Sequence, residues 1–173
     1  MPFTPFHMGA ALIVKPAART HLSLITFGIA QIAMDIEPFI GMIRQSDILY
    51  GPTHTLMGAM TIGFLVALVS PSICRPILRR YNQEVKTYKL GWLSEPTEPT
   101  RLAIWFGALW GTLSHILLDC FMHDDIRPFA PFSNANPLLH MISHDGVYQL
   151  CVALSAAGCT AWLLTKWFRR HAA

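Results

Sequence analysis

The amino-acid sequence predicts an all-α fold: a multi-pass membrane helical bundle with about four transmembrane helices and a short N-terminal half-helix. The first reason is composition, because 53% of the 173 residues are hydrophobic and only 13% are charged, against about 25% charged in a typical soluble domain. The second reason is that the apolar residues form segments long enough to cross a hydrocarbon core of about 30 Å. The third reason is the uneven placement of Lys and Arg. We expect one membrane-embedded domain over residues 1–173.

The N-terminal stretch from Phe6 to Val14 is apolar but short. At about 1.5 Å per residue, a helix of this length crosses at most half of a bilayer. We therefore expect a half-helix that either packs on the bundle or enters the membrane part-way. In the second case it would carry His7 into the membrane with it.

The first predicted span carries two carboxylates, Asp35 and Glu37, followed directly by Pro38. A proline inside a helix removes one backbone hydrogen bond and clashes with the preceding turn. It also disfavours helical geometry at the residue before it. We therefore predict a break or kink near Pro38, which would let both carboxylates turn inward.

The second span follows a turn at Gly51 and Pro52, with Thr53 as a predicted N-cap and His54 in the first helical turn. The third span is 21 nearly unbroken apolar residues, about 31 Å as a helix. The predicted spans are approximately 22–43, 53–72, 102–122 and 146–168, joined by a cytoplasmic loop at 73–100 and an outer loop at 123–145. Within the cytoplasmic loop we expect a short helix around residues 75–87.

The Lys and Arg residues predict the orientation of the bundle. With both termini in the cytoplasm, the inner side collects all of them except Arg44 and Arg127, which is a strong positive-inside bias. We therefore expect a multi-pass membrane protein with both termini in the cytoplasm and the lipid bilayer as its first partner. The net charge of +3, without a strip of basic residues, predicts no nucleic-acid partner.

Ionisable side chains interrupt the apolar segments at matching depths. His115, Asp119 and His123 are spaced by four residues, so they share one face of a helix. Asp35 and His115 are each the fourteenth residue of their spans, and both spans start inside, so their side chains reach a similar depth. His54 opens a span that starts outside. Because ionisable groups inside a membrane are costly and usually functional, we expect these groups to meet in the outer part of the bundle.

Four short motifs stand out along the chain: Pro5-Phe6-His7, Asp35-Ile36-Glu37-Pro38, Gly51-Pro52-Thr53-His54-Thr55 and Ser114-His115-Ile116-Leu117-Leu118-Asp119. They resemble the membrane-bound metal-dependent hydrolases of the YdjM type, a LexA-regulated inner-membrane family. The resemblance covers most of the chain from residue 5 to about 137 and implies a small multi-pass protein of the bacterial inner membrane. It also implies a set of metal-ligand candidates: His7, Asp35, His54, His115 and Asp119. It implies nothing about the substrate.

These residues predict a membrane-embedded hydrolase that depends on a divalent metal, since imidazole and carboxylate suit Zn, with Mn or Fe as alternatives. It would act at the outer face on a phosphoester, ester or amide, carried by a lipid or a lipid-linked molecule. The catalytic candidates are Glu37, His123 and Asp124 as acid or base, and Ser114 as an orienting donor.

Two other functions remain open. The same polar groups would serve as a relay in a metal-ion or proton transporter or channel subunit, which would have to oligomerise because four spans are few for a transport path. Alternatively, the groups would only hold helices together in a structural or regulatory membrane protein.

Overall fold

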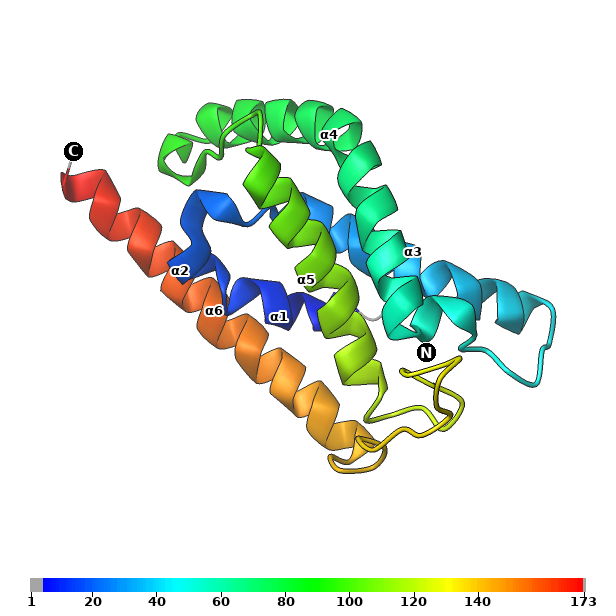
Figure 1. Ribbon diagram of the computed structural model, residues 1–173. Coiled ribbons are helices and arrows are strands. Elements are labelled where there is room, and N and C mark those ends of the chain that lie inside the picture. The colour runs from blue at the N-terminus through cyan, green and yellow to red at the C-terminus, as the bar shows by residue number, and fades with distance from the viewer. Residues whose placement is uncertain (1–4, 173) are drawn as a thin grey trace.

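The structure, a computed structural model, describes residues 5–172 and is helical throughout its regular elements (Figure 1). Within these residues, four helices are long and apolar enough to cross a membrane. They are α3 (Leu24–Ile43), α4 (Leu56–Thr87), α5 (Arg101–Asp119) and α6 (His144–Ala172). The shorter elements are η1 (Pro5–Met8), α1 (Gly9–Leu12), α2 (Lys15–Ala18), η2 (Arg19–His21), η3 (Pro52–His54) and η4 (Gly91–Leu93). The predicted fold class is therefore confirmed.

Helix α5 is the centre of the bundle. The apolar stretch of α5 is 61% buried, whereas the apolar stretches of the other three long helices are 17–39% buried, and α5 packs on both α3 and α4. The crossing with α3 depends on Gly111, because a Cβ there would lie 2.6 Å from the Cβ of Ala30. Small residues allow such close approach of membrane helices. The residues at the far end of α5, His115 and Asp119, are consequently buried inside the bundle.

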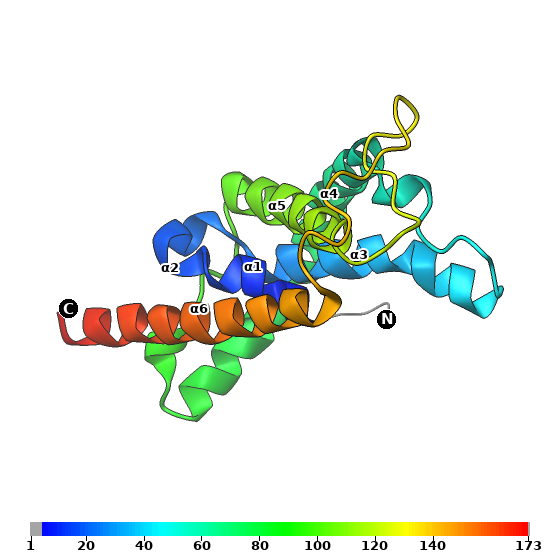
Figure 2. The ribbon, with the colours of Figure 1, turned by 90° about the horizontal axis from the view of Figure 1, so that it is seen from below.

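The N-terminal segment is part of the bundle rather than a separate arm. Figure 2 shows α1 lying along α6, and the two helices pack closely. A Cβ on Gly9 would lie 2.5 Å from the carbonyl oxygen of Cys151, and a Cβ on Gly158 would lie 2.3 Å from the carbonyl carbon of Leu12. This backbone-to-backbone contact fixes the position of η1 and directs His7 into the interior, where it is 1% exposed.

The break or kink expected near Pro38 is not present. Helix α3 continues through Pro38 to Ile43 without interruption. A proline is tolerated in a membrane helix when its surroundings satisfy the freed backbone groups. Because the helix is continuous, Asp35 and Glu37 remain about 200° apart around its axis and face different neighbours.

The short helix expected around residues 75–87 is present, but it is continuous with the second span, so α4 extends to Thr87 and only the remainder of the 73–100 connection is a loop. Cys74, Leu78 and Val85 are buried along this part of α4, and their spacing of four and seven residues places them on one face. This apolar stripe packs the extension of α4 against the bundle. Figure 1 shows α4 turning between its two halves, and the prolines inside it, Pro71 and Pro76, account for the bend.

Candidate metal centre

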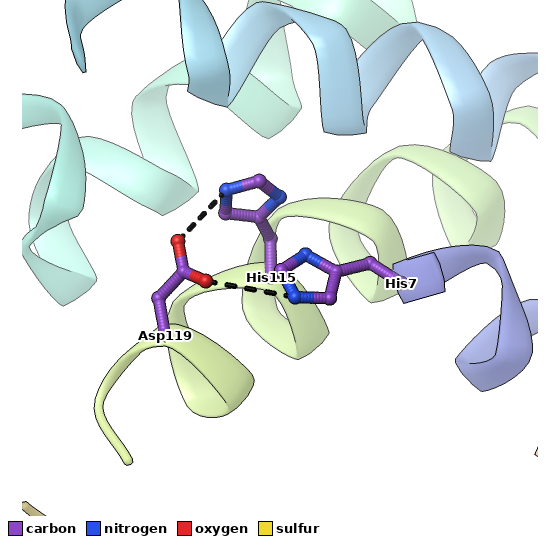
Figure 3. Close-up of side chains that lie close together, drawn as sticks. All are labelled: His7, His115 and Asp119. Carbon is purple, nitrogen blue, oxygen red and sulfur yellow. Dashed lines mark ion pairs between the residues drawn. The ribbon is translucent and has the colours of Figure 1, made fainter. Parts of the chain in front are cut away.

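Five ionisable side chains from four separate elements converge in the interior, and we refer to them as the buried cluster. They come from η1, α3, η3 and α5 and are at most 5% exposed: His7, Asp35, His54, His115 and Asp119. Figure 3 shows His7 and His115 approaching the two carboxylate oxygens of Asp119 from different sides. The helix register brings Asp119 one turn beyond His115, so both project from the same face of α5.

The carboxylate of Asp119 is the common neighbour of three imidazole rings. Its Oδ2 lies 3.1 Å from Nε2 of His115 and 3.6 Å from Nε2 of His54, and its Oδ1 lies 3.6 Å from Nε2 of His7. Asp35 approaches the same point, with Oδ1 lying 3.4 Å from Nε2 of His115. One ligand atom each from His7, His115 and Asp119 lies within 4.8 Å of the others.

These short distances are not hydrogen bonds. The Nε2 atoms of His7, His54 and His115 are buried, and none has a hydrogen-bond partner in the described part of the chain. Buried polar atoms are normally paired, so each exception requires an explanation. Nitrogen atoms that converge on carboxylate oxygens without donating to them have the arrangement of ligands around a cation, and imidazole with carboxylate suits Zn, Mn or Fe.

The tautomer of His115 is determined by Gln31 on α3. The Gln31 side-chain NH₂ donates to the carbonyl oxygen of Gly111 at 2.8 Å, so its Oε1 faces Nδ1 of His115 at 2.6 Å. Because an amide oxygen only accepts, the proton of His115 must be on Nδ1. The lone pair of His115 is then on Nε2, directed at Asp119, which is the form that binds a metal.

Glu37 determines the tautomer of His54 in a similar way. Oε2 of Glu37 accepts from the backbone N–H groups of Gly51 and Thr53 at 3.1 and 3.0 Å, and from the Thr53 hydroxyl. Since the hydroxyl proton is committed to the carboxylate, Thr53 Oγ1 accepts from Nδ1 of His54 at 2.9 Å. Nε2 of His54 is therefore also unprotonated and faces Asp119.

His7 is suited to the same role by its surroundings. Burial lowers its pKa below the ordinary value, an effect that Asp119 partly offsets. The ring is therefore neutral at pH 7, and neutral imidazole is the ligand form. Its ring lies edge-on to that of His115, with centroids 4.9 Å apart.

A tyrosine–histidine pair covers the buried cluster. The ring of Tyr50 stacks on His123 at 4.2 Å and meets His54 edge-on at 4.8 Å, and its hydroxyl lies 2.9 Å from Nε2 of His123. Asp125 anchors this lid by accepting from the backbone N–H of Leu49 and Tyr50 at 2.9 and 3.1 Å. Burial lowers the pKa of His123 and raises that of Tyr50. At pH 7 His123 is neutral and Tyr50 keeps its proton.

A family model described as the YdjM inner membrane protein matches residues 2–172. This chain belongs to the YdjM inner membrane protein family. No curated protein and no solved structure matches it. The match extends the resemblance through α6, and the family description places the chain in an inner membrane. That description names no reaction, so the chemistry of this YdjM protein rests on the geometry of the buried cluster.

The structure brings together the five metal-ligand candidates of this YdjM protein but not all of its catalytic candidates. His123 lies at the lid. Glu37 lies behind His54, with 3.6 Å between its Oε2 and the ring Nδ1. Asp124 is on the surface, where it pairs with His140 at 3.3 Å, and Ser114 donates to the carbonyl oxygen of Gly111 at 3.3 Å. Neither Asp124 nor Ser114 is part of the cluster.

Three supporting residues were not assigned to the site from the sequence: Gln31, Tyr50 and Thr53. Gln31 had a detectable signal, because it is an amide inside an apolar span, four residues before Asp35 and so on the same helical face. Thr53 was predicted only as an N-cap, a role that falls to Thr55, whose hydroxyl accepts from the backbone N–H of Gly58. No sequence pattern marks Tyr50, because its role depends on the contact between its own loop and the loop that carries His123.

Proposed function

We propose that this YdjM-family protein is a membrane-embedded, metal-dependent hydrolase. The observation that carries the proposal is the set of three buried, unpaired Nε2 atoms around the Asp119 carboxylate. His7, His54, His115 and Asp119 would hold the ion, with Asp35 beside His115. The ion is Zn in this proposal, with Mn or Fe as alternatives. A bound divalent ion polarises a phosphoryl or carbonyl oxygen and acidifies water.

His123 and Tyr50 are positioned to transfer protons at the edge of the buried cluster. Neutral His123 accepts a proton at a ring nitrogen, as a general base does. Tyr50 retains its hydroxyl proton at pH 7 and can donate it to a substrate oxygen. In this proposal His123 acts as the base, whereas Glu37 orients His54 through Thr53.

The surroundings of Tyr50 favour a phosphoester over an ester or amide. A cavity of about 630 Å³ adjoins the lid and is lined by Tyr50, Asp125, Arg127 and apolar residues that include Ile48 and Met57. A guanidinium pairs well with a phosphate group. Ile48 and Met57 are exposed on the apolar exterior, which favours a substrate with a lipid tail. We propose a lipid-linked phosphoester.

Metal analysis of the purified protein, combined with phosphate release from phosphatidic acid in detergent micelles, tests this function. We expect about one metal ion per chain, and loss of both metal and hydrolysis in His115→Ala and Asp35→Ala. His140→Ala is the matched control because His140 lies on the surface. A purified, folded protein without bound transition metal would refute the proposal.

A structural metal centre is the second candidate. The four proposed donors are at most 3% exposed, and structural zinc sites are typically closed to solvent. The His123→Gln variant separates the two functions. Under the hydrolase proposal it retains the metal and loses hydrolysis, whereas a purely structural centre shows metal-dependent stability and no hydrolysis in any variant.

The transport alternative requires a polar path across the membrane. Ser23, Thr26, Ser70 and Cys74 form a second buried polar group further along the bundle. On α3, the fully buried Phe27 lies between Thr26, which belongs to this second group, and Gln31, which contacts the buried cluster. An apolar side chain therefore lies between the two polar regions along this helix. Metal or proton flux into liposomes containing the protein, above that of empty liposomes, would favour transport.

A further inference from the structure

Two cavities adjoin at the end of the bundle that carries most of the Lys and Arg residues. Their volumes are about 280 and 220 Å³. They share five lining residues, Lys15, Thr20, Glu95, Pro96 and Trp162. Beyond these, the larger cavity is mainly apolar, whereas the smaller one is lined by three further cationic side chains, Arg19, Lys166 and Arg169.

The smaller cavity has more positive than negative charge. Glu95 is its single carboxylate, and each oxygen takes one ammonium group: Oε2 lies 3.2 Å from Nζ of Lys15, and Oε1 lies 2.9 Å from Nζ of Lys166. Arg19 and Arg169 line the same cavity. One carboxylate therefore faces four cations, and a further anion would complement the site.

Lys15 is held in an unusually buried position. It is 3% exposed, and its Nζ also donates to the carbonyl oxygen of Leu22 at 2.9 Å. Burial of a charged group is costly unless it is paired. Burial lowers the pKa of Lys15, and Glu95 opposes that shift. The Lys15 ammonium group is therefore held in a fixed position by its protein partners rather than being solvated.

The larger cavity lies between helices and suits an alkyl chain. Leu22, Leu24, Ile77 and Leu78 line it, and Trp162 lies where the two cavities meet. The aromatic and basic residues on this end of α6 mark the membrane–water interface: Lys166 lies over the Trp162 ring at 5.8 Å, and Arg170 over the Trp167 ring at 5.3 Å.

This region is separate from the buried cluster. Ala103 lines the apolar cavity, and Asp119 lies sixteen residues further along the same helix, which is about 24 Å at the rise of an α-helix. An occupant of these cavities would therefore not reach the metal-ligand candidates.

We propose that the two cavities bind one anionic phospholipid of the leaflet on the Lys- and Arg-rich side, with the phosphate in the cationic cavity and one acyl chain in the apolar cavity. Basic pockets between transmembrane helices on the cytoplasmic side are suited to anionic headgroups. A free phosphate shares the headgroup chemistry but leaves the adjoining apolar cavity unfilled. The arrangement therefore favours the lipid.

Native mass spectrometry of the full chain, released from detergent micelles, tests the proposal. The micelles would contain phosphatidylglycerol or phosphatidylcholine with identical acyl chains, and a third sample would contain inorganic phosphate alone. We expect phosphatidylglycerol adducts to exceed phosphatidylcholine adducts, with no retained phosphate. The Arg19→Gln/Arg169→Gln variant should weaken phosphatidylglycerol binding by about tenfold or more.

The control is Arg79→Gln/Lys86→Gln, which removes two exposed cations from the same end of the bundle without touching either cavity. It should retain phosphatidylglycerol. Equal retention of the two lipids by the unmodified chain overturns the proposal without any variant. Retention of inorganic phosphate in the third sample, or equal losses of phosphatidylglycerol in the two double variants, overturns it as well.

Discussion

The side-chain oxygen of Gln31 lies 2.6 Å from Nδ1 of His115 and holds the opposite ring nitrogen toward Asp119. An amide on one helix thereby determines which nitrogen of an imidazole on another helix is free to bind a metal. Partners of this kind orient metal ligands and tune their affinity.

We expect Gln31→Leu to weaken metal binding about 10- to 100-fold, because the His115 ring loses the acceptor that fixes its tautomer. Competition with a chelator measures the affinity. Ser114→Ala is the control, since it removes a different donor to the Gly111 carbonyl oxygen and leaves Gln31 in place. Equal affinity in the Gln31→Leu and unmodified proteins would exclude this role for Gln31.

Glu37→Ala should destabilise the protein by about 1–3 kcal/mol, because the backbone N–H groups of Gly51 and Thr53 lose their acceptor. Metal affinity should fall as well, since His54 loses its orientation. Thermal unfolding and metal titration measure the two effects. A variant with unchanged stability and metal content but no hydrolysis would instead make Glu37 a catalytic acid or base.

The free energy of unfolding should decrease as the pH is lowered, over a pH range set by the pKa of His123. Burial lowers the pKa of His123 below the ordinary 6.5, with Asp119 and Asp125 opposing the shift and His144 adding to it. The folded state therefore binds this proton less readily than the unfolded state. The contribution of His123 to stability is complete above about pH 6.5 and is lost as the pH falls through the folded-state pKa of His123.

The thermal midpoint, measured from about pH 7.5 to 5.5, checks this expectation. The His123→Gln variant should show a weaker decline over that range, whereas His140→Gln should behave like the unmodified protein because His140 is exposed. An identical pH dependence in the His123→Gln variant would show that other groups cause the loss.

Gly111→Ala should cost about 1–3 kcal/mol of stability, because the added Cβ would lie 2.6 Å from that of Ala30 and force α3 and α5 apart. The same shift would move Gln31 away from His115. The double variant Gly111→Ala/Ala30→Gly should recover part of the loss. Gly28→Ala is the matched control, since the nearest atom to its Cβ would be Met8 Sδ at 3.9 Å.

The sequence was sufficient for much of the fold, because hydrophobic length alone predicts membrane-spanning helices. It also predicted that Asp35 and His115 reach equal depth, and the structure places their side chains 3.4 Å apart. Such depth matching works because helical rise is constant. A short helix around residues 75–87 was predicted, but its continuity with the second span was not, because its buried stripe is narrow and lies among charged residues.

The direction of Glu37 could not be read from the chain. It depends on whether Pro38 breaks its helix, and that is decided by packing around α3 rather than by the proline itself. The stacking of Tyr50 on His123 was similarly inaccessible, since two irregular loops must fold before these rings meet. Tertiary contacts of this kind have no periodic pattern in the sequence.

The close packing of α1 on α6 has a consequence for biogenesis. None of the five residues of the buried cluster lies on α6, yet α6 holds in place the segment that carries His7. During synthesis, four of these residues can assemble once α5 has inserted. Helix α5 already contacts this segment through Trp110, whose Nε1 donates to the carbonyl oxygen of Ala10 at 2.9 Å. The close backbone packing that positions His7 forms only when α6 enters the membrane, so the complete cluster requires insertion of all four long helices.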